Sequence, residues 1–125
     1  MIKGILIDPR QQLIVEATRD AGDYRTLYTL LSDEHVRVAT FTMIHLSRRE
    51  VMFLDEGGLL WQPTPPLFQL KGFDQPLAGR AVIEGVTPSG KPRDTRMTAL
   101  EVSALITFRP DLELAAFRSS QKLWK

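Results

Sequence analysis

The sequence lacks cysteine, contains only two histidines and carries almost no net charge. The missing cysteines exclude disulfides, thiolate metal sites and a cysteine nucleophile, and their absence is typical of a reducing compartment. Sixteen Lys and Arg residues against fifteen Asp and Glu residues leave no acidic excess, as a DNA mimic would need, and no clear basic excess, as a nonspecific DNA-binding protein would need. The N-terminal apolar run at residues 5–7 is too short for a signal-peptide core, and no run approaches the roughly 18 residues of a membrane span. We therefore expect a cytoplasmic protein without a membrane segment.

Several catalytic motifs are absent as well. There is no glycine-rich phosphate loop of the Walker or dinucleotide type and no G-x-S-x-G elbow. His35 and His45 are ten residues apart, so they cannot form a helical zinc pair. We expect neither a cofactor nor a metal, and we favour a binding protein over an enzyme.

Hydrophobic periodicity predicts an α+β fold in one domain, residues 1–125. The pattern predicts strands at 2–7, 13–16, 36–46, 50–54 and 80–86 and helices at 24–31 and 98–107. We expect a mixed, mostly antiparallel sheet of about five or six strands, with two or three helices packed on one face. A half-open barrel with the helices as lids is the alternative.

Individual segments carry more specific signals. Asp23 is placed to cap the helix at 24–31, and Thr98 and Glu101 have the spacing of a capping box. Neither face of residues 36–46 is strongly polar, which predicts a central, largely covered strand. Residues 62–79 hold four prolines and two glycines, which favours a packed irregular loop. Residues 111–123 fit a helix or a strand, and we prefer the helix.

The stretch VMFLDEGGLLW at 51–61 interrupts an apolar run with two acids and two glycines. The composition of Asp55, Glu56, Gly57 and Gly58 is typical of a hairpin turn, in which one glycine would have a positive φ angle. Alternatively, Asp55 or Glu56 is an acid or base at a strand end, and His45 on the neighbouring strand is a third candidate catalytic residue. By this pairing, however, His45 lies near the opposite end of its strand from the acids.

Candidate ligand-binding residues form a basic turn. Arg80, Lys91, Arg93 and Arg96 could hold a phosphate or nucleotide through charge-assisted hydrogen bonds, or they could form a solvated loop. Arg48 and Arg49 are predicted to lie solvated at a hairpin tip. Trp61 either joins the proline-rich segment in a contact surface or fills the core beneath it.

The order of the segments YRTLYTLLSDEHVRVATF, VMFLDEGGLLWQPTPPLF and PLAGRAVIEG resembles a family of small domains of unknown function carried by phages, plasmids and other mobile elements. The likeness spans roughly residues 1–108, and it leaves out the basic turn and the last seventeen residues. It implies a habitat rather than a chemistry: proteins of this kind often bind host-defence proteins, a signalling nucleotide or another copy of themselves.

Three functional hypotheses follow. The first is a non-enzymatic binding protein of a mobile element, which forms a homo-oligomer and binds a protein or a small anionic ligand. The second is a small hydrolase or lyase, which requires the 55–56 turn and the basic turn to open into one cleft. The third is a nucleic-acid module, which requires Lys91, Arg93, Arg96 and the pair Arg48-Arg49 on one face.

Overall fold

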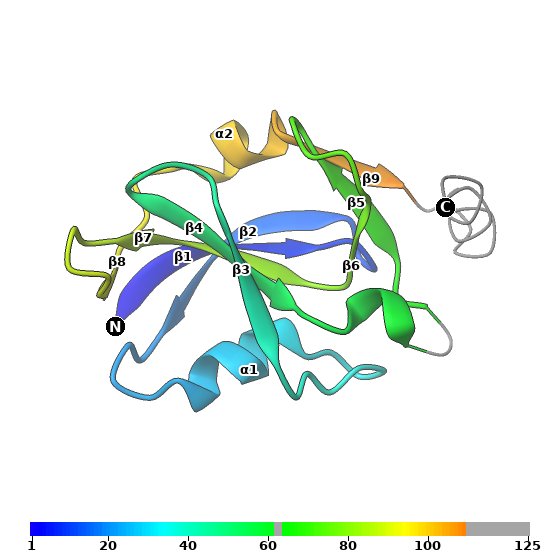
Figure 1. Ribbon diagram of the computed structural model, residues 1–125, viewed down its shortest axis with the longest axis horizontal. Helices are drawn as coiled ribbons and strands as arrows, with labels where there is room; N and C mark the ends of the chain where they lie inside the picture. Colours follow the sequence, from blue (N-terminus) through cyan, green and yellow to red (C-terminus); the bar gives the residue numbers. More distant parts are fainter. Residues whose placement is uncertain (62–63, 110–125) are drawn as a thin grey trace, which may run out of the picture.

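The computed structural model describes residues 1–61 and 64–109. In chain order its elements are β1 (Ile2–Asp8), β2 (Leu13–Arg19), α1 (Arg25–Leu31), β3 (Phe41–His45), β4 (Glu50–Asp55), the short 3-10 helix η1 (Gly58–Leu60), β5 (Leu67–Leu70), β6 (Leu77–Ala78), β7 (Ala81–Val86), β8 (Pro92–Arg93), α2 (Ala99–Ser103) and β9 (Ile106–Arg109). A six-stranded sheet has the order β2-β1-β7-β4-β3, with β8 paired to β7, and a second sheet has the order β6-β5-β9 (Figure 1). Every strand pairing among these residues is antiparallel, and the sheets do not close into a barrel. The predicted α+β class and antiparallel sheet are therefore confirmed.

Apolar side chains cover both faces of the larger sheet. On one face, Leu27 and Leu31 of α1 pack with Phe53 and Val82. On the other face, Val102 of α2 and the side chains of β5, β6 and β9 pack with Met52 and Ile83. The expectation that the helices share one face is wrong, because the neighbouring residues Val82 and Ile83 of β7 point to opposite faces and each face needs its own cover. Figure 1 shows α1 and α2 on opposite sides of the sheet.

The segment predicted as a central strand at 36–46 is a strand only from Phe41, and β3 lies at the edge of the sheet. Val36 and Val38 are buried, but they pack with α1. Their N–H groups donate to Asp33 Oδ1 and Ser32 Oγ, each over 2.9 Å. Hydrogen bonds to nearby side chains thus take the place of backbone hydrogen bonds to a neighbouring strand. Burial of Asp33 opposes its ionisation, but hydrogen bonds from Arg10 and two backbone N–H groups outweigh that effect and lower its pKa.

The DEGG stretch is a turn but not a hairpin. β4 ends at Asp55, whose Oδ1 accepts the N–H of Gly57 over 2.9 Å, and η1 then leads the chain towards the second sheet. The predicted positive φ angle is wrong: Gly57 has a φ of −97°, and the positive-φ glycines of the described chain are Gly72, Gly79 and Gly90. Glycine is needed at Gly58 for another reason, because an added Cβ would lie 2.9 Å from the carbonyl oxygen of Ala78. Glu56 is exposed, as predicted.

This turn yields a first prediction. Gly58→Ala should lower the free energy of unfolding by about 1–3 kcal/mol, because the new methyl group would overlap backbone atoms that no rotamer change can move. Gly57→Ala and Glu56→Ala should each stay within about 0.5 kcal/mol of the parent protein, as most surface changes do. Urea unfolding followed by circular dichroism measures all three. Equal losses at both glycines would contradict the proposed role of Gly58.

The predictions for the second half are mixed. The proline-rich segment is less irregular than expected, since β5 is the central strand of the smaller sheet. The capping box is confirmed: Glu101 N–H donates to Thr98 Oγ1 and Thr98 N–H donates to Glu101 Oε1, each over 3.1 Å. The helix nevertheless ends at Ser103, and β9 follows instead of the predicted continuation to 107. Residues 111–123 lie outside the described part of the chain.

The other early predictions are confirmed with small shifts. The N-terminal hairpin forms from β1 and β2, and the strands at 50–54 and 80–86 are β4 and β7. The first helix begins one residue later than expected, with Tyr24 at the N-cap position and without a side-chain cap. The carboxylate of Asp23 instead accepts the N–H of Arg25 over 3.0 Å.

Candidate functional site

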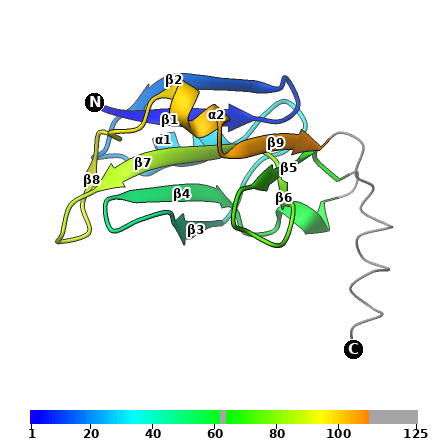
Figure 2. The same cartoon turned by 90° about the horizontal axis from the view of Figure 1, so that it is seen from above.

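Two turns meet at one end of the larger sheet. Residues 46–49 connect β3 to β4, and residues 87–91 connect β7 to β8. β4 and β7 are neighbours, with Glu50 opposite Gly85, and the N–H of Val86 donates to the carbonyl oxygen of Arg49 over 2.8 Å. Figure 2 shows both turns at the same end of the molecule, with β5 and β6 at the other end. Antiparallel pairing thus brings together two turns that are distant in sequence.

A hollow of about 640 Å³ lies between these turns, and we call it the arginine cleft. It is lined by His45, Arg48, Arg49, Val86, Thr87, Pro88, Gly90, Arg93 and Arg96. Arg93 is half-buried, and the other three arginines are exposed. Within residues 1–61 and 64–109, none of the four guanidinium groups forms a hydrogen bond or an ion pair, and no carboxylate lines the cleft.

The wall formed by residues 92–96, which we call the strap, is held in place by a buried carboxylate. Glu50 is 7% exposed, and its carboxylate accepts the Oγ1 hydroxyl of Thr95 over 2.6 Å and the N–H of Arg96 over 3.0 Å. The N–H of Thr95 donates to the carbonyl oxygen of Lys3 over 2.9 Å, and Asp94 Oδ1 accepts the N–H of Lys3 over 2.8 Å. Glu50 therefore fixes the backbone that carries Arg96 while its own charge is satisfied.

The opposite wall of the cleft is the turn at residues 46–49, and hydrogen bonds between near neighbours in sequence order both this turn and the turn at residues 87–91. Ser47 Oγ accepts the N–H groups of Arg49 and Glu50, each over 3.1 Å. In the other turn, Thr87 Oγ1 accepts the N–H of Lys91 over 3.0 Å. Both turns are thus shaped by hydrogen bonds within the protein that do not involve the side chains of Arg48 and Arg49, which stay available for a ligand.

The structure brings together only part of the predicted basic cluster. Arg93 and Arg96 line the cleft, and His45 joins them. Lys91 is exposed at the end of the turn at residues 87–91 but does not line the hollow. Arg48 and Arg49, which the sequence places at a solvated tip, form the other wall. No spacing rule reveals this arrangement, because it depends on the pairing of β4 with β7.

Arg80 and Trp61 lie elsewhere. Arg80 donates from Nε to Asp8 Oδ2 over 3.2 Å and from Nη1 to the carbonyl oxygen of Ser32 over 2.9 Å, so it joins β1 to the end of α1. Trp61 is half-buried against the core on the α1 side, and its Nε1–H donates to Asp55 Oδ2 over 2.7 Å. Neither side chain lines the arginine cleft.

The acids of the DEGG stretch are far from the basic turn. Asp55 pairs with Phe41 at one end of the β3–β4 ladder, whereas His45 pairs with Val51 at the other end. Both carboxylate oxygens of Asp55 already accept hydrogen bonds, one from Gly57 and one from Trp61. The single cleft that the hydrolase hypothesis requires is therefore not formed.

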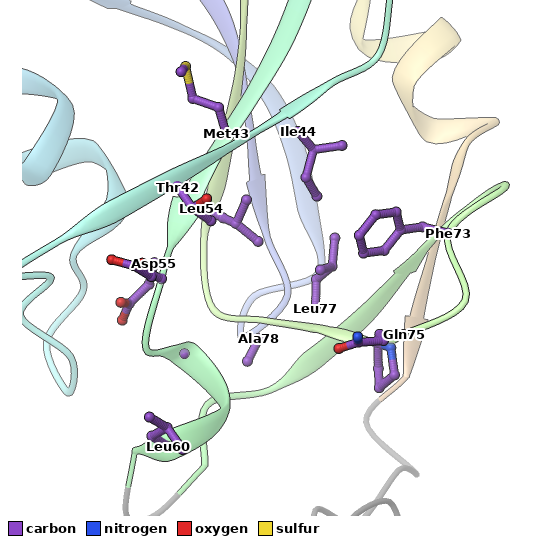
Figure 3. Close-up of a pocket in the computed structure, with 13 residues that line it drawn as sticks. Thr42, Met43, Ile44, Leu54, Asp55, Leu60, Phe73, Gln75, Leu77 and Ala78 are labelled. Atoms are coloured by element: carbon purple, nitrogen blue, oxygen red, sulfur yellow. The ribbon is translucent and has the colours of Figure 1, made fainter. Parts of the chain in front are cut away.

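A second hollow, of about 450 Å³, lies beside this acidic end, and we call it the apolar hollow. It is lined by Thr42, Met43, Ile44, Leu54, Asp55, Glu56, Gly58, Leu60, Phe73, Gln75, Pro76, Leu77 and Ala78. Figure 3 shows Ile44 and Leu54 of the larger sheet on one side of the hollow and Phe73 and Leu77 on the other. The hollow thus lies between the edge of the larger sheet and the segment that leads from β5 to β6.

Comparisons with known proteins found no matching family model, no similar curated protein and no similar solved structure. Among the described residues, no group of three or more histidine or acidic side chains is arranged to hold a metal ion. None of the helices in residues 1–61 and 64–109 has the length and apolar character needed to cross a bilayer.

Proposed function

We propose that this chain is a binding protein for a ligand that carries two or more phosphate groups, held in the arginine cleft. The observation that carries the proposal is that one hollow of about 640 Å³ is lined by four arginines whose side chains form no hydrogen bond or ion pair within the described residues. Guanidinium groups bind phosphate oxygens in pairs of parallel hydrogen bonds, and they shed water more readily than ammonium groups. Several like charges held together also repel one another, and an anion relieves that repulsion.

The setting of the cleft supports binding of a defined ligand. The protein as a whole has a net charge of only +1, so attraction of anions depends on this local cluster rather than on the overall field. The Val86–Arg49 backbone bond and Glu50 hold the two walls in place, so the backbone of the cleft needs little reordering on binding. A nucleotide and the backbone of a nucleic acid both carry several phosphate groups.

The chemistry of the lining favours binding over turnover. His45 is the one side chain in the lining of a type that commonly acts as a general base, and no carboxylate lines the cleft to orient it. The habitat implied by the family resemblance, a phage, plasmid or other mobile element, is part of this proposal. It suggests a signalling nucleotide or a nucleic acid as the first ligands to try.

The test is titration of the purified protein with pyrophosphate, ATP and a short single-stranded DNA at low salt. We expect Arg93→Gln combined with Arg96→Gln to weaken binding of the preferred ligand about a hundredfold, because two charge-assisted contacts are lost. The control is Arg37→Gln, which removes an exposed charge outside the cleft and should change affinity less than about twofold.

Salt dependence distinguishes the two ligand classes. For DNA, the logarithm of the binding constant should fall with log salt concentration at about 0.7 per phosphate contacted, whereas ATP offers a fixed small number of contacts. Failure of all three anions to bind at low salt, or an equal loss for Arg37→Gln and the cleft variant, would refute the proposal.

A further inference from the structure

The outer edge of β3 carries free backbone groups whose positions follow from the β3–β4 ladder. Leu46 N–H donates to Glu50 O over 3.0 Å, and Glu56 N–H donates to Thr40 O over 3.2 Å. Because hydrogen-bonded pairs alternate in an antiparallel ladder, Thr42 and Ile44 also direct their backbone groups towards β4. The N–H and C=O groups of Phe41, Met43 and His45 therefore point away from the sheet. β3 is the last strand on this side in the described chain, so these groups can pair with another strand.

Apolar side chains are exposed beside this edge. Met43 is 49% exposed, Leu60 75% and Phe73 38%, and all three border the apolar hollow. Thr42 and Ile44 of β3 also line it, so a strand added to β3 would place alternate side chains over the hollow. An exposed apolar patch next to an open strand edge is the arrangement used in strand addition.

An acid marks one end of the same face. Glu56 is exposed, lines the apolar hollow and forms no hydrogen bond or ion pair through its carboxylate within the described chain. It stands opposite Thr40, so its side chain points to the same face as those of Thr42 and Leu54. The complementary strand would have apolar residues opposite Ile44 and Thr42 and a basic residue opposite Thr40.

This chain itself contains that pattern, beginning in β3. Ile44, Leu46 and Arg48 follow one another at every second position. If two copies of β3 pair antiparallel with Ile44 opposite Ile44, then Leu46 of each copy lies opposite Thr42 of the other, over the hollow. The turn at residues 46–49, which carries Arg48, then comes beside Thr40 of the other copy, at the end of the sheet where Glu56 lies. In this register Met43 and His45 of the two copies exchange backbone hydrogen bonds, as their outward direction requires.

We propose that a second copy of this chain docks on β3, forming a two-fold symmetric dimer with one continuous sheet across both copies. The contact has backbone bonds between the β3 edges, apolar packing of Ile44 and Leu46 beside the hollow, and two Glu56–Arg48 ion pairs related by symmetry. A closed two-fold contact also removes the open edge, which would otherwise invite aggregation. Arg48 lines the arginine cleft as well, and the other three arginines stay available there in the dimer.

The experiment is a charge-swap cycle measured by analytical ultracentrifugation of the full chain over a range of concentrations. Glu56→Arg and Arg48→Glu should each raise the dimer dissociation constant about tenfold, because each change replaces two attractive contacts by two repulsive ones. The double variant should recover to within about threefold of the parent protein, since it restores both pairs in reverse. Glu34→Arg is the control, as it reverses an exposed charge outside the edge.

A backbone variant tests the strand pairing separately. Met43→Pro removes an N–H that points away from β4, so the fold should tolerate it, but it should convert the dimer to a monomer. Met43→Ala keeps the N–H and should stay dimeric, and thermal melts would confirm that both variants are folded. A parent protein that is monomeric at millimolar concentration would overturn the proposal and leave the edge to a strand of another protein. A dimer that survives Met43→Pro and does not respond to the charge swap would overturn it as well.

Discussion

Glu84→Ala should lower the free energy of unfolding by about 3–5 kcal/mol, because it leaves the buried guanidinium of Arg19 without its counter-charge. The side chains of Arg19 and Glu84 are only 4% and 1% exposed. Arg19 donates from both Nε and Nη2 to the two carboxylate oxygens of Glu84, the latter over 2.8 Å. Urea unfolding followed by circular dichroism gives the difference.

Arg19 is in β2 and Glu84 is in β7, and the strand β1 lies between them. A small residue of β1 leaves space for this ion pair. β1 has glycine at Gly4, where an added Cβ would lie 3.2 Å from Glu84 Cγ and 2.8 Å from the carbonyl oxygen of Ile83. The charges therefore meet across a strand that offers no side chain at the crossing. The pair Lys3–Glu16 has no such enclosure: its charged atoms are 3.9 Å apart, and its side chains are 39% and 61% exposed.

Two control variants test whether the loss of stability comes from leaving a buried charge unpaired. Arg19→Met combined with Glu84→Met removes both charges while keeping volume, and it should cost far less than the two single changes together. Glu16→Ala should change stability by less than about 0.5 kcal/mol, since exposed pairs contribute little. If Glu84→Ala lowered the free energy of unfolding by less than the double variant does, an unpaired buried charge would not be the cause of the loss.

Gly85→Ala should lower the free energy of unfolding by about 3 kcal/mol and also weaken anion binding in the arginine cleft. An added Cβ would lie 2.3 Å from the carbonyl oxygen of Asp94 and 3.0 Å from Arg93 Cγ. The first of these is a backbone atom, so relief requires the strap to move away from β7. The strap carries Arg93 and Arg96, so its displacement changes one wall of the cleft.

Stability and pyrophosphate affinity are measured on the same variant. The control is Gly57→Ala, for which the nearest atom to the added Cβ is 3.7 Å away and the backbone has an ordinary negative φ angle. It should change neither quantity. A stable Gly85→Ala protein with unchanged affinity would show that the strap does not depend on its close approach to β7.

Elements that depend on local interactions could be predicted from the sequence. The hairpin of β1 and β2, the strands β4 and β7 and the helix α1 follow from side-chain periodicity. The Thr98–Glu101 capping box follows from a spacing of three residues, because both of its hydrogen bonds join groups within one helical turn. The exposure of Glu56 follows from turn composition alone.

Features that depend on contacts between distant residues were decided by the tertiary structure. The apolar residues at 36–46 pack partly on α1 and partly in a strand, and sequence periodicity does not say which neighbour covers them. The two glycines of the DEGG stretch predict a hairpin turn. In the structure, position 58 needs glycine because Ala78 of another strand approaches its backbone closely. Likewise, no local sequence pattern predicts the order of the strands in the sheet.

The candidate site shows the same division. The sequence shows two separate arginine-containing segments, residues 46–49 and 87–96, and each by itself is indistinguishable from a solvated loop. Only the pairing of Glu50 with Gly85 sets Arg48 and Arg49 across from Arg93 and Arg96. The physical reason is that side-chain chemistry is a property of single residues, whereas a site requires charges to share a small volume, and only long-range strand pairing brings them there.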